Sequence, residues 1–111
     1  MNNSFLKDMR FYNVEDGLDL LRSGGAITMS WGVSLITPLE YKGEVRGLAF
    51  NVNGNHFQGT VILSANFMDY YEVRFMKDGE IVEDMTMIDI FVMDAINLID
   101  EKVEKLESYS Y

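Results

Sequence analysis

The sequence predicts an α+β domain in which an antiparallel meander sheet of four to five strands is covered on one face by a C-terminal helix, with a short N-terminal helix before it. Three observations lead to this fold. Apolar and polar residues alternate through the middle of the chain, which is the pattern of strands with one buried face. Turn-forming dipeptides that contain glycine separate these runs. A segment of helical periodicity follows, and a sheet with one apolar face needs such a cover.

The 111 residues predict a single domain, 1–111, whose residues 1–12 are expected to form either a loosely ordered lead-in or a short helical turn. A composition of 48% hydrophobic and 24% charged residues is that of a globular protein rather than a disordered one. The chain has no cysteine, no apolar run of membrane-spanning length and no signal-peptide pattern at its start. We therefore expect a cytoplasmic protein without membrane contact.

A short helix is expected over 14–23. Asn13 is a favourable N-cap, and Glu15 lies in the first turn, where the helix dipole favours acids. Gly24 and Gly25 supply the stop.

The first strand is expected over 26–36, because its residues alternate strictly, and Pro38 ends it. One face of this strand would carry Ile27, Met29, Trp31, Val33 and Leu35. After a turn at Lys42-Gly43, a second strand is expected over 45–53 and a third over 56–64. Asn53-Gly54 between them predicts a two-residue type I′ hairpin that places Phe50 opposite Phe57.

The fourth strand is expected over 70–76, with Tyr71, Val73 and Phe75 pointing inward. The loop before it, 65–69, carries two large apolar side chains. Asp78-Gly79 predicts another tight turn, followed by a short strand over 80–83.

The last helix is expected over 86–107, with Thr86 and Asp89 resembling a capping box. On a helical wheel its apolar side holds Ile88, Phe91, Val92, Ala95, Ile96, Leu98, Ile99, Val103 and Leu106. Its polar side holds Asp89, Asp94, Asn97, Asp100, Glu101, Glu104 and Glu107. The apolar side is expected to close the core.

Residues with catalytic or ligand-binding patterns are scarce. His56 is the single histidine, and without cysteine it has no partners for an ordinary zinc site. No serine lies in a nucleophile-elbow pattern, and no glycine motif precedes a helix as a phosphate-binding loop does. The sequence therefore predicts a protein that is not an enzyme and that uses no metal or cofactor.

The charge is unevenly distributed. Residues 51–111 hold four basic and twelve acidic residues, so they carry −8 of the total of −9. Such a surface repels nucleic acid and attracts a basic protein surface. The alternative is that the acidity only keeps the protein soluble.

Two apolar residues, Ile90 and Met93, fall within the acidic arc of the last helix. Either the first turns of this helix are buried all round, or the pair is an exposed hot spot rimmed by acids. Phe67 and Met68 form a second candidate. The predicted partner-binding residues are Asp89, Ile90, Met93, Asp94, Asn97, Asp100, Glu101, Glu104, Phe67 and Met68.

The segment TVILSANFMDYYEVRF, followed by DGEIVEDMTMIDIFVMDAINLI, resembles small uncharacterised proteins of phages and other mobile elements. The resemblance covers residues 60–100. It implies a short strand, a loop, a tyrosine-containing strand and a terminal helix in this order, encoded by a mobile element. It contains no motif that carries chemistry.

Three functions fit these observations. The protein could inhibit a nucleic-acid-binding host enzyme by occupying its basic groove, as anti-CRISPR and anti-restriction proteins do. It could instead be an adaptor that forms a homodimer through Phe91, Leu98 or an open sheet edge. The third hypothesis is a small-molecule binder with Trp31, Tyr71 and His56 around a cavity between sheet and helix.

Overall fold

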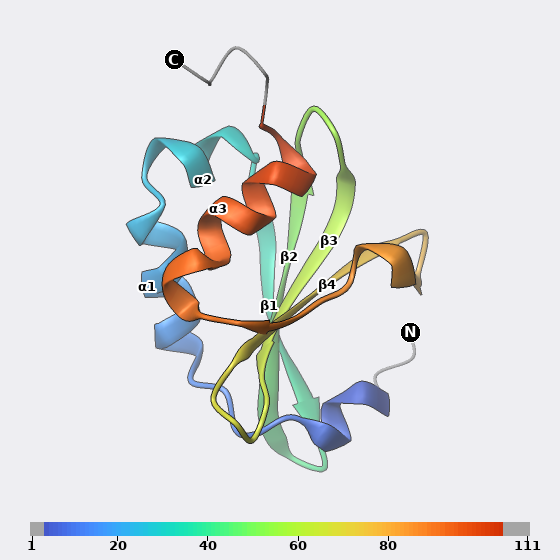
Figure 1. Cartoon of the computed structure of the whole chain (residues 1–111). Helices are drawn as coiled ribbons and strands as arrows, with labels where there is room; N and C mark the ends of the chain where they lie inside the picture. The colour runs from blue at the N-terminus through green and yellow to red at the C-terminus, as the bar shows by residue number, and fades with distance from the viewer. Residues whose placement is uncertain (1–3, 106–111) are drawn as a thin grey trace.

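Helices cover one face of a twisted antiparallel sheet in the computed structural model, which describes residues 4–105 (Figure 1). The strands are β1 (Ser34–Tyr41), β2 (Glu44–Asn53), β3 (Gln58–Ala65), β4 (Tyr71–Lys77), β5 (Glu80–Ile81) and β6 (Met87–Ile90). The helices are α1 (Val14–Ser23), α2 (Ala26–Ser30) and α3 (Val92–Val103), with 3₁₀ helices η1 (Ser4–Asp8) and η2 (Glu83–Met85). The predicted α+β class is confirmed.

The sheet follows the order of the chain. Its strands run β1-β2-β3-β4-β5, each antiparallel to the next, and β6 pairs with β4 beside β5. Helix α3 crosses in front of the sheet, with α1 and α2 to its left (Figure 1). It contacts β4, α1 and α2. Within residues 4–105, no helix combines the length and apolarity needed to cross a membrane.

The main core lies between the sheet and its helices. The inward side chains are buried as alternation predicted for β2, β3 and β4 and as the helical wheel predicted for α3: Leu48, Phe50, Val61, Leu63, Val73, Phe75, Ala95, Ile99 and Val103. A smaller cluster on the opposite face joins Leu6 and Met9 to Leu39, Ala49 and Ile62. Residues 4–9 of the expected lead-in therefore pack onto the sheet and cover part of its second face.

Helix α1 forms where the sequence predicted it. The Asn13 side-chain oxygen accepts a hydrogen bond from the Glu15 amide at 2.9 Å, which satisfies one of the free amides of the first turn. Gly17 has a packing role, because a Cβ there would lie 2.6 Å from Cδ2 of Leu48. A glycine in the middle of this helix lets α1 approach the sheet closely.

The predicted strand over 26–36 is wrong in its first half. Gly25 (φ 53°) and Gly32 (φ 63°) both adopt left-handed conformations, and the segment between them forms the short helix α2. Strand β1 begins only at Ser34. Trp31 is buried as predicted, whereas Ile27, Met29 and Leu35 are exposed. Pro38 lies inside β1 rather than after it, which an edge strand tolerates.

The predicted two-residue hairpin at Asn53-Gly54 is also wrong. Asn53 pairs with Gln58, so residues 54–57 form the loop and Phe50 lies opposite Val61. The loop is held by α3, because the amides of His56 and Phe57 donate to the Val103 carbonyl. The register differs from the predicted one by an even number of residues, so each strand still turns its apolar residues toward the core.

The predicted last helix begins too early. Residues 87–90 form strand β6, in which Ile90 pairs with Tyr71 and Met87 with Val73. Asp89 has φ 56°, which no helix interior allows. Within residues 4–105, Thr86 Oγ1 has no hydrogen-bond partner, so the expected capping box is absent. Helix α3 starts at Val92, and Leu106 and Glu107 lie outside the described residues.

Candidate functional site

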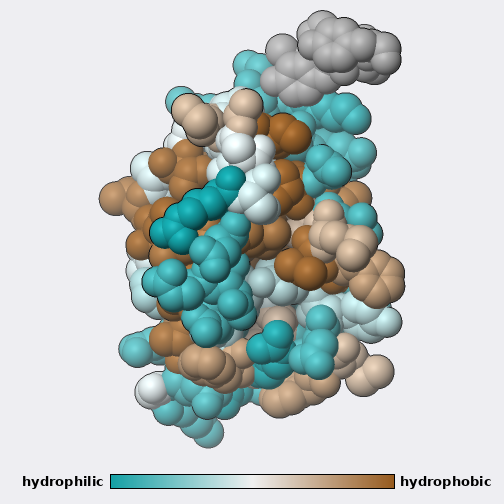
Figure 2. Space-filling view, turned by 90° about the vertical axis from the view of Figure 1, so that its left-hand side faces the viewer, coloured by the Kyte–Doolittle hydropathy of each residue, from teal (hydrophilic) through white to brown (hydrophobic). Residues whose placement is uncertain are grey.

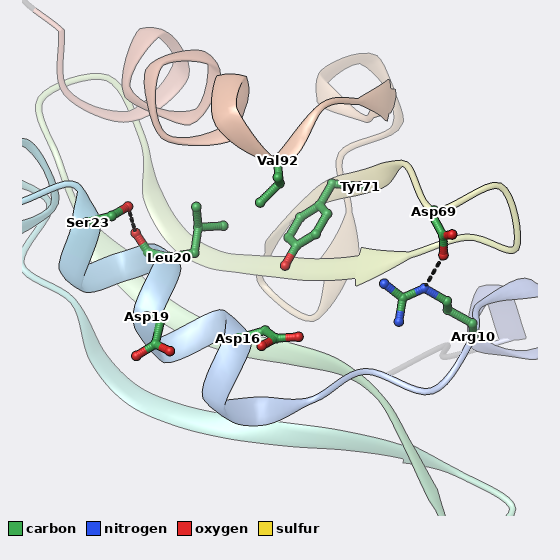
Figure 3. Close-up of a pocket in the computed structure, with 8 residues that line it drawn as sticks. All are labelled: Arg10, Asp16, Asp19, Leu20, Ser23, Asp69, Tyr71 and Val92. Atoms are coloured by element: carbon green, nitrogen blue, oxygen red, sulfur yellow. Dashed lines mark hydrogen bonds and ion pairs between the residues drawn. The ribbon is translucent and has the colours of Figure 1, made fainter.

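A groove runs between α1–α2 and the first turns of α3. One end is a hollow of about 460 Å³ lined by Arg10, Asp16, Asp19, Leu20, Ser23, Asp69, Tyr71 and Val92 (Figure 3). The other end is a hollow of about 230 Å³ lined by Leu20, Ser23, Gly24, Ile27, Val92, Met93, Ile96 and Asn97. The two hollows share Leu20, Ser23 and Val92, so they adjoin each other. We call the two together the α1–α3 groove.

Most side chains that line the middle and one end of the groove are apolar, beside the polar Ser23 and Asn97. Leu20 of α1 and Val92 of α3 face each other across it (Figure 3). Val92 is 49% exposed, Met93 is 82% exposed, and Ile27 of α2 is 38% exposed. Leaving such side chains in water forgoes the free energy of burying them. Contiguous exposed apolar side chains of this kind characterise interaction sites.

The other end of the groove is acidic. Asp16 and Asp19 lie on α1, and Asp69 lies on the β3–β4 loop. Arg10 is the only basic residue among the lining residues of this hollow, and its Nε lies 2.9 Å from Oδ1 of Asp69. The lining therefore holds three carboxylates and one guanidinium that is already paired. This end presents a negative potential to an incoming partner.

The loop that carries Asp69 is shaped by its own hydrogen bonds. The Asn66 side-chain oxygen accepts from the amides of Met68 (2.9 Å) and Tyr70 (3.2 Å), and the Asn66 carbonyl accepts from the Asp69 amide (3.0 Å). Asp69 adopts φ 65°, which aspartate tolerates better than most residues. An Asn-centred turn of this type places the Asp69 carboxylate beside Arg10.

A pair of tyrosines lies at the back of the acidic end. The hydroxyls of Tyr12 and Tyr71 are 2.9 Å apart and buried. Burial raises the pKa of both phenols above their usual value, and for Tyr12 the hydrogen bond to Tyr71 raises the pKa further. Both phenols therefore stay protonated at physiological pH. The pair acts as a neutral, hydrogen-bonded support for the groove rather than as an acid–base group.

Helix α3 presents part of the predicted partner-binding set to solvent. Met93 and Asn97 line the groove, and Asp94 and Glu101 are exposed on the same helix. Asp89 is exposed on β6, before the helix begins. Five of the eight predicted residues within 89–104 therefore remain accessible to a partner, and two of them lie in the groove itself.

Ile90 and Asp100 do not belong to that surface. Ile90 is buried in β6 opposite Tyr71. Asp100 is 5% exposed, and its Oδ1 accepts a 2.9 Å hydrogen bond from the Trp31 indole. The prediction that these two residues contact a partner is therefore wrong, because both are part of the core. The helical wheel placed Asp100 on the acidic side because a wheel shows only the residues of one helix. It takes no account of the Trp31 indole, which donates to Asp100 from outside α3.

Glu104 is occupied by the fold as well. Its carboxylate accepts from the Asn55 amide at 2.6 Å and from the Asn55 side chain at 2.9 Å. These bonds hold the β2–β3 loop against the end of α3. Glu104 is half-buried and serves this loop rather than forming a free acidic surface.

Phe67 and Met68 are exposed on the β3–β4 loop, at 70% and 76%. This loop neighbours the start of α3, because the Tyr70 ring packs edge-on against Phe91 with centroids 5.4 Å apart. Asp69 of the same loop lines the groove. The second predicted patch therefore lies near the acidic end of the α1–α3 groove, whereas Met93 of the first lines the other end.

The groove residues on α1 were not predicted. Asp16 lies in the first turn, where the helix dipole accounts for an acid, and Leu20 fits the apolar stripe of any amphipathic helix. Nothing in their spacing shows that α3 passes beside them. Only the tertiary packing of α1 against α3 brings these residues together.

The residues of the small-molecule hypothesis do not share a cavity. Trp31 is fully buried and stacks on Phe50 with planes 5° apart. His56 is exposed, and its ring contacts the Lys105 carbonyl. Side chains of the core fill the space between α3 and the sheet. Within residues 4–105, no group of three or more histidine, aspartate or glutamate residues is arranged to hold a metal ion.

Comparison with known proteins assigns no family. No family model, curated protein or solved structure matches this chain.

Proposed function

We propose that this protein is a non-enzymatic interaction module that binds a basic surface of another protein through the α1–α3 groove. The observation that carries the proposal is the composition of the groove. An apolar stretch with Val92 and Met93 adjoins an end that holds three carboxylates and one paired arginine. This combination suits a partner that offers aliphatic or aromatic side chains beside Lys or Arg.

The two ends would contribute differently to binding. Apolar side chains that become buried in a complex contribute affinity, up to about 1.5–3 kcal/mol for a fully buried Val or Met side chain. The carboxylates attract a basic partner from a distance and orient it, which mainly raises the association rate. Because the carboxylates are exposed, this contribution weakens with salt.

A nucleic-acid-binding enzyme is the class of partner that fits best. Such enzymes carry Lys and Arg in the groove that receives phosphates. With a net charge of −9, this protein would compete with nucleic acid for that groove rather than bind nucleic acid itself. Together with the resemblance to mobile-element proteins, this favours an inhibitor of a host enzyme, of the anti-CRISPR or anti-restriction type.

The test begins with capture of partners from the host, identified by mass spectrometry, followed by binding measurements with the purified partner. The double variant Asp16→Asn/Asp19→Asn removes two groove carboxylates. The matched control Glu80→Gln/Asp84→Asn removes two exposed carboxylates around β5 and η2, away from the groove. We expect the groove variant to bind at least about tenfold more weakly and the control to bind like the wild type.

Equal losses of affinity in both double variants would show a general effect of net charge and would contradict the groove as the binding site. A partner whose nucleic acid binding is unaffected by this protein would refute the competitive mechanism. Binding that does not weaken with rising salt would contradict the role of the carboxylates.

A further inference from the structure

Three further exposed apolar side chains lie where α2 leads into β1. Met29 is 81% exposed, Leu35 is 74% exposed and Ile36 is 43% exposed. We call these three residues the α2–β1 patch. The whole stretch 23–39 contains no Asp, Glu, Lys or Arg. Figure 2 looks onto the side of the molecule that carries α1 and α2, and hydrophobic residues (brown) are exposed in its upper half.

Leu35 is held in a conformation that leucine disfavours. Its φ is 52°, in the left-handed region, which costs a non-glycine residue about 1–2 kcal/mol. The register of β1 against β2 shifts between Ser34 and Thr37, and the Thr37 hydroxyl donates to the Leu35 carbonyl at 3.0 Å. Irregularities of this kind redirect a side chain. Here the Leu35 side chain projects into solvent. Its burial therefore does not stabilise the fold and does not offset the cost of its backbone conformation.

A hollow of about 510 Å³ is lined by residues of α1 and α2 and by the residues that lead into β1. Its apolar lining comes from Leu21, Met29 and Val33, and Val33 is two residues before Leu35. The hollow stays open at Gly25, where a Cβ would meet no atom within 4 Å. Arg22 also lines the hollow, but its charge is already paired with Asp19 at 2.8 Å.

We infer that the α2–β1 patch is a self-association surface whose occupant is the same patch of a second copy. A twofold interface requires one patch that is complementary to itself. A protruding leucine two residues after Val33, which lines an apolar hollow, meets this requirement, because Leu35 of each copy can enter the hollow of the other.

Charge opposes a second copy less at this place than at the acidic surfaces of the chain. Each chain carries −9, so contacts through the α1–α3 groove or the exposed face of α3 would bring carboxylates together. The uncharged stretch 23–39 avoids that repulsion. Strand β1 is also the edge of the sheet, and within residues 4–105 it pairs with β2 alone. The side facing away from β2 is therefore accessible to another chain.

This inference does not depend on the proposed function. The α2–β1 patch and its hollow share no residue with the α1–α3 groove.

The test is sedimentation velocity of the full chain over a series of concentrations. We expect a dimer whose dissociation constant rises at least tenfold in Leu35→Glu. The matched control is Met68→Glu, which adds the same charge at a side chain of similar exposure on the β3–β4 loop and should leave the dimer intact. Circular dichroism and Trp31 fluorescence establish that each variant is folded.

Leu35→Gly provides a second variant that adds no charge. It removes the protruding side chain and relieves the backbone, so we expect a monomer that is at least as stable to urea as the wild type. A wild-type chain that is monomeric at every concentration would overturn the inference. So would a Leu35→Glu variant that dimerises like the wild type, or a Met68→Glu variant that loses the dimer equally.

Discussion

The indole Nε1 of Trp31 donates a 2.9 Å hydrogen bond to Oδ1 of Asp100, which joins the end of α2 to the last turn of α3 inside the core. Trp31 is fully buried and Asp100 is 5% exposed. A buried indole N–H needs a partner, and a buried carboxylate needs a donor. This pair fixes the position of α2 against α3 and so helps to define the apolar end of the α1–α3 groove.

Replacing Asp100 by Ala should destabilise the protein. The substitution leaves the indole N–H buried without its partner, which costs about 1–3 kcal/mol. The loss is measured by urea unfolding followed through the fluorescence of Trp31, the single tryptophan. Glu101→Ala is the control, because Glu101 is the adjacent exposed residue of α3 and its loss should change stability by less than about 0.5 kcal/mol. Equal stability of the two variants would contradict a structural role for Asp100.

The Tyr12–Tyr71 pair predicts a loss of stability in alkali. Both phenols have pKa values raised above the unfolded value of 10.0, chiefly by burial. Below pH 10 the folded and unfolded chains bind these protons equally. Above pH 10 the unfolded chain releases them first, so the free energy of unfolding falls as pH rises.

The double variant Tyr12→Phe/Tyr71→Phe isolates this effect. It removes both hydroxyls together and leaves no buried hydroxyl unpaired, so its stability at neutral pH should stay within about 1.5 kcal/mol of the wild type. Above pH 10 its stability should decline less steeply than that of the wild type, as measured by urea unfolding at several pH values. Parallel declines would show that the pair does not govern the alkaline transition.

Gly54→Ala should destabilise the junction between the β2–β3 loop and α3. A Cβ at this position would lie 2.3 Å from the Val103 carbonyl oxygen and 2.5 Å from Val103 Cγ1. The backbone oxygen cannot move aside without shifting the end of α3, so we expect a loss of about 1–3 kcal/mol from overpacking. Thermal unfolding measures the change. A gain in stability, as Gly→Ala produces where the site has room, would refute the close approach.

Met93→Ser should weaken partner binding without affecting the fold. Met93 is 82% exposed in the groove, so the folded chain loses little contact when it is truncated, and stability should change by less than about 0.5 kcal/mol. Loss of an apolar contact at the centre of an interface costs more than about 1 kcal/mol of binding free energy. The measurement is calorimetric titration with the captured partner.

The control for Met93→Ser is Ile88→Ser. Ile88 is 60% exposed on β6 and does not line the groove. We expect this variant to bind like the wild type. A larger loss of binding free energy in Ile88→Ser than in Met93→Ser would show that the binding surface lies outside the groove.

The sequence by itself determined the class of fold, the strands β2, β3 and β4, the helix α1 and the inward faces of the sheet. These features follow from short-range rules. Alternation sets the faces of a strand, and Asn13 with its following acids defines the start of α1. The apolar side of α3 was also predictable from Ala95, Ile99 and Val103, because a helix that covers a sheet needs one continuous apolar stripe.

Only the tertiary structure decided the remaining features, because each depends on a contact between segments distant in sequence. Residues 87–90 form a strand because they pair with the edge of β4. The loop over residues 54–57, which was predicted as a two-residue turn, is held by hydrogen bonds to the Val103 carbonyl. Asp100 lies in the core because its carboxylate accepts a hydrogen bond from the buried Trp31 indole. Met93 and Asn97 were predictable candidates, but their groove exists only because α1 packs beside α3 and brings Asp16, Asp19 and Leu20 to face them. Periodicity reports which side of an element is apolar, and it contains no information about which other element lies opposite that side.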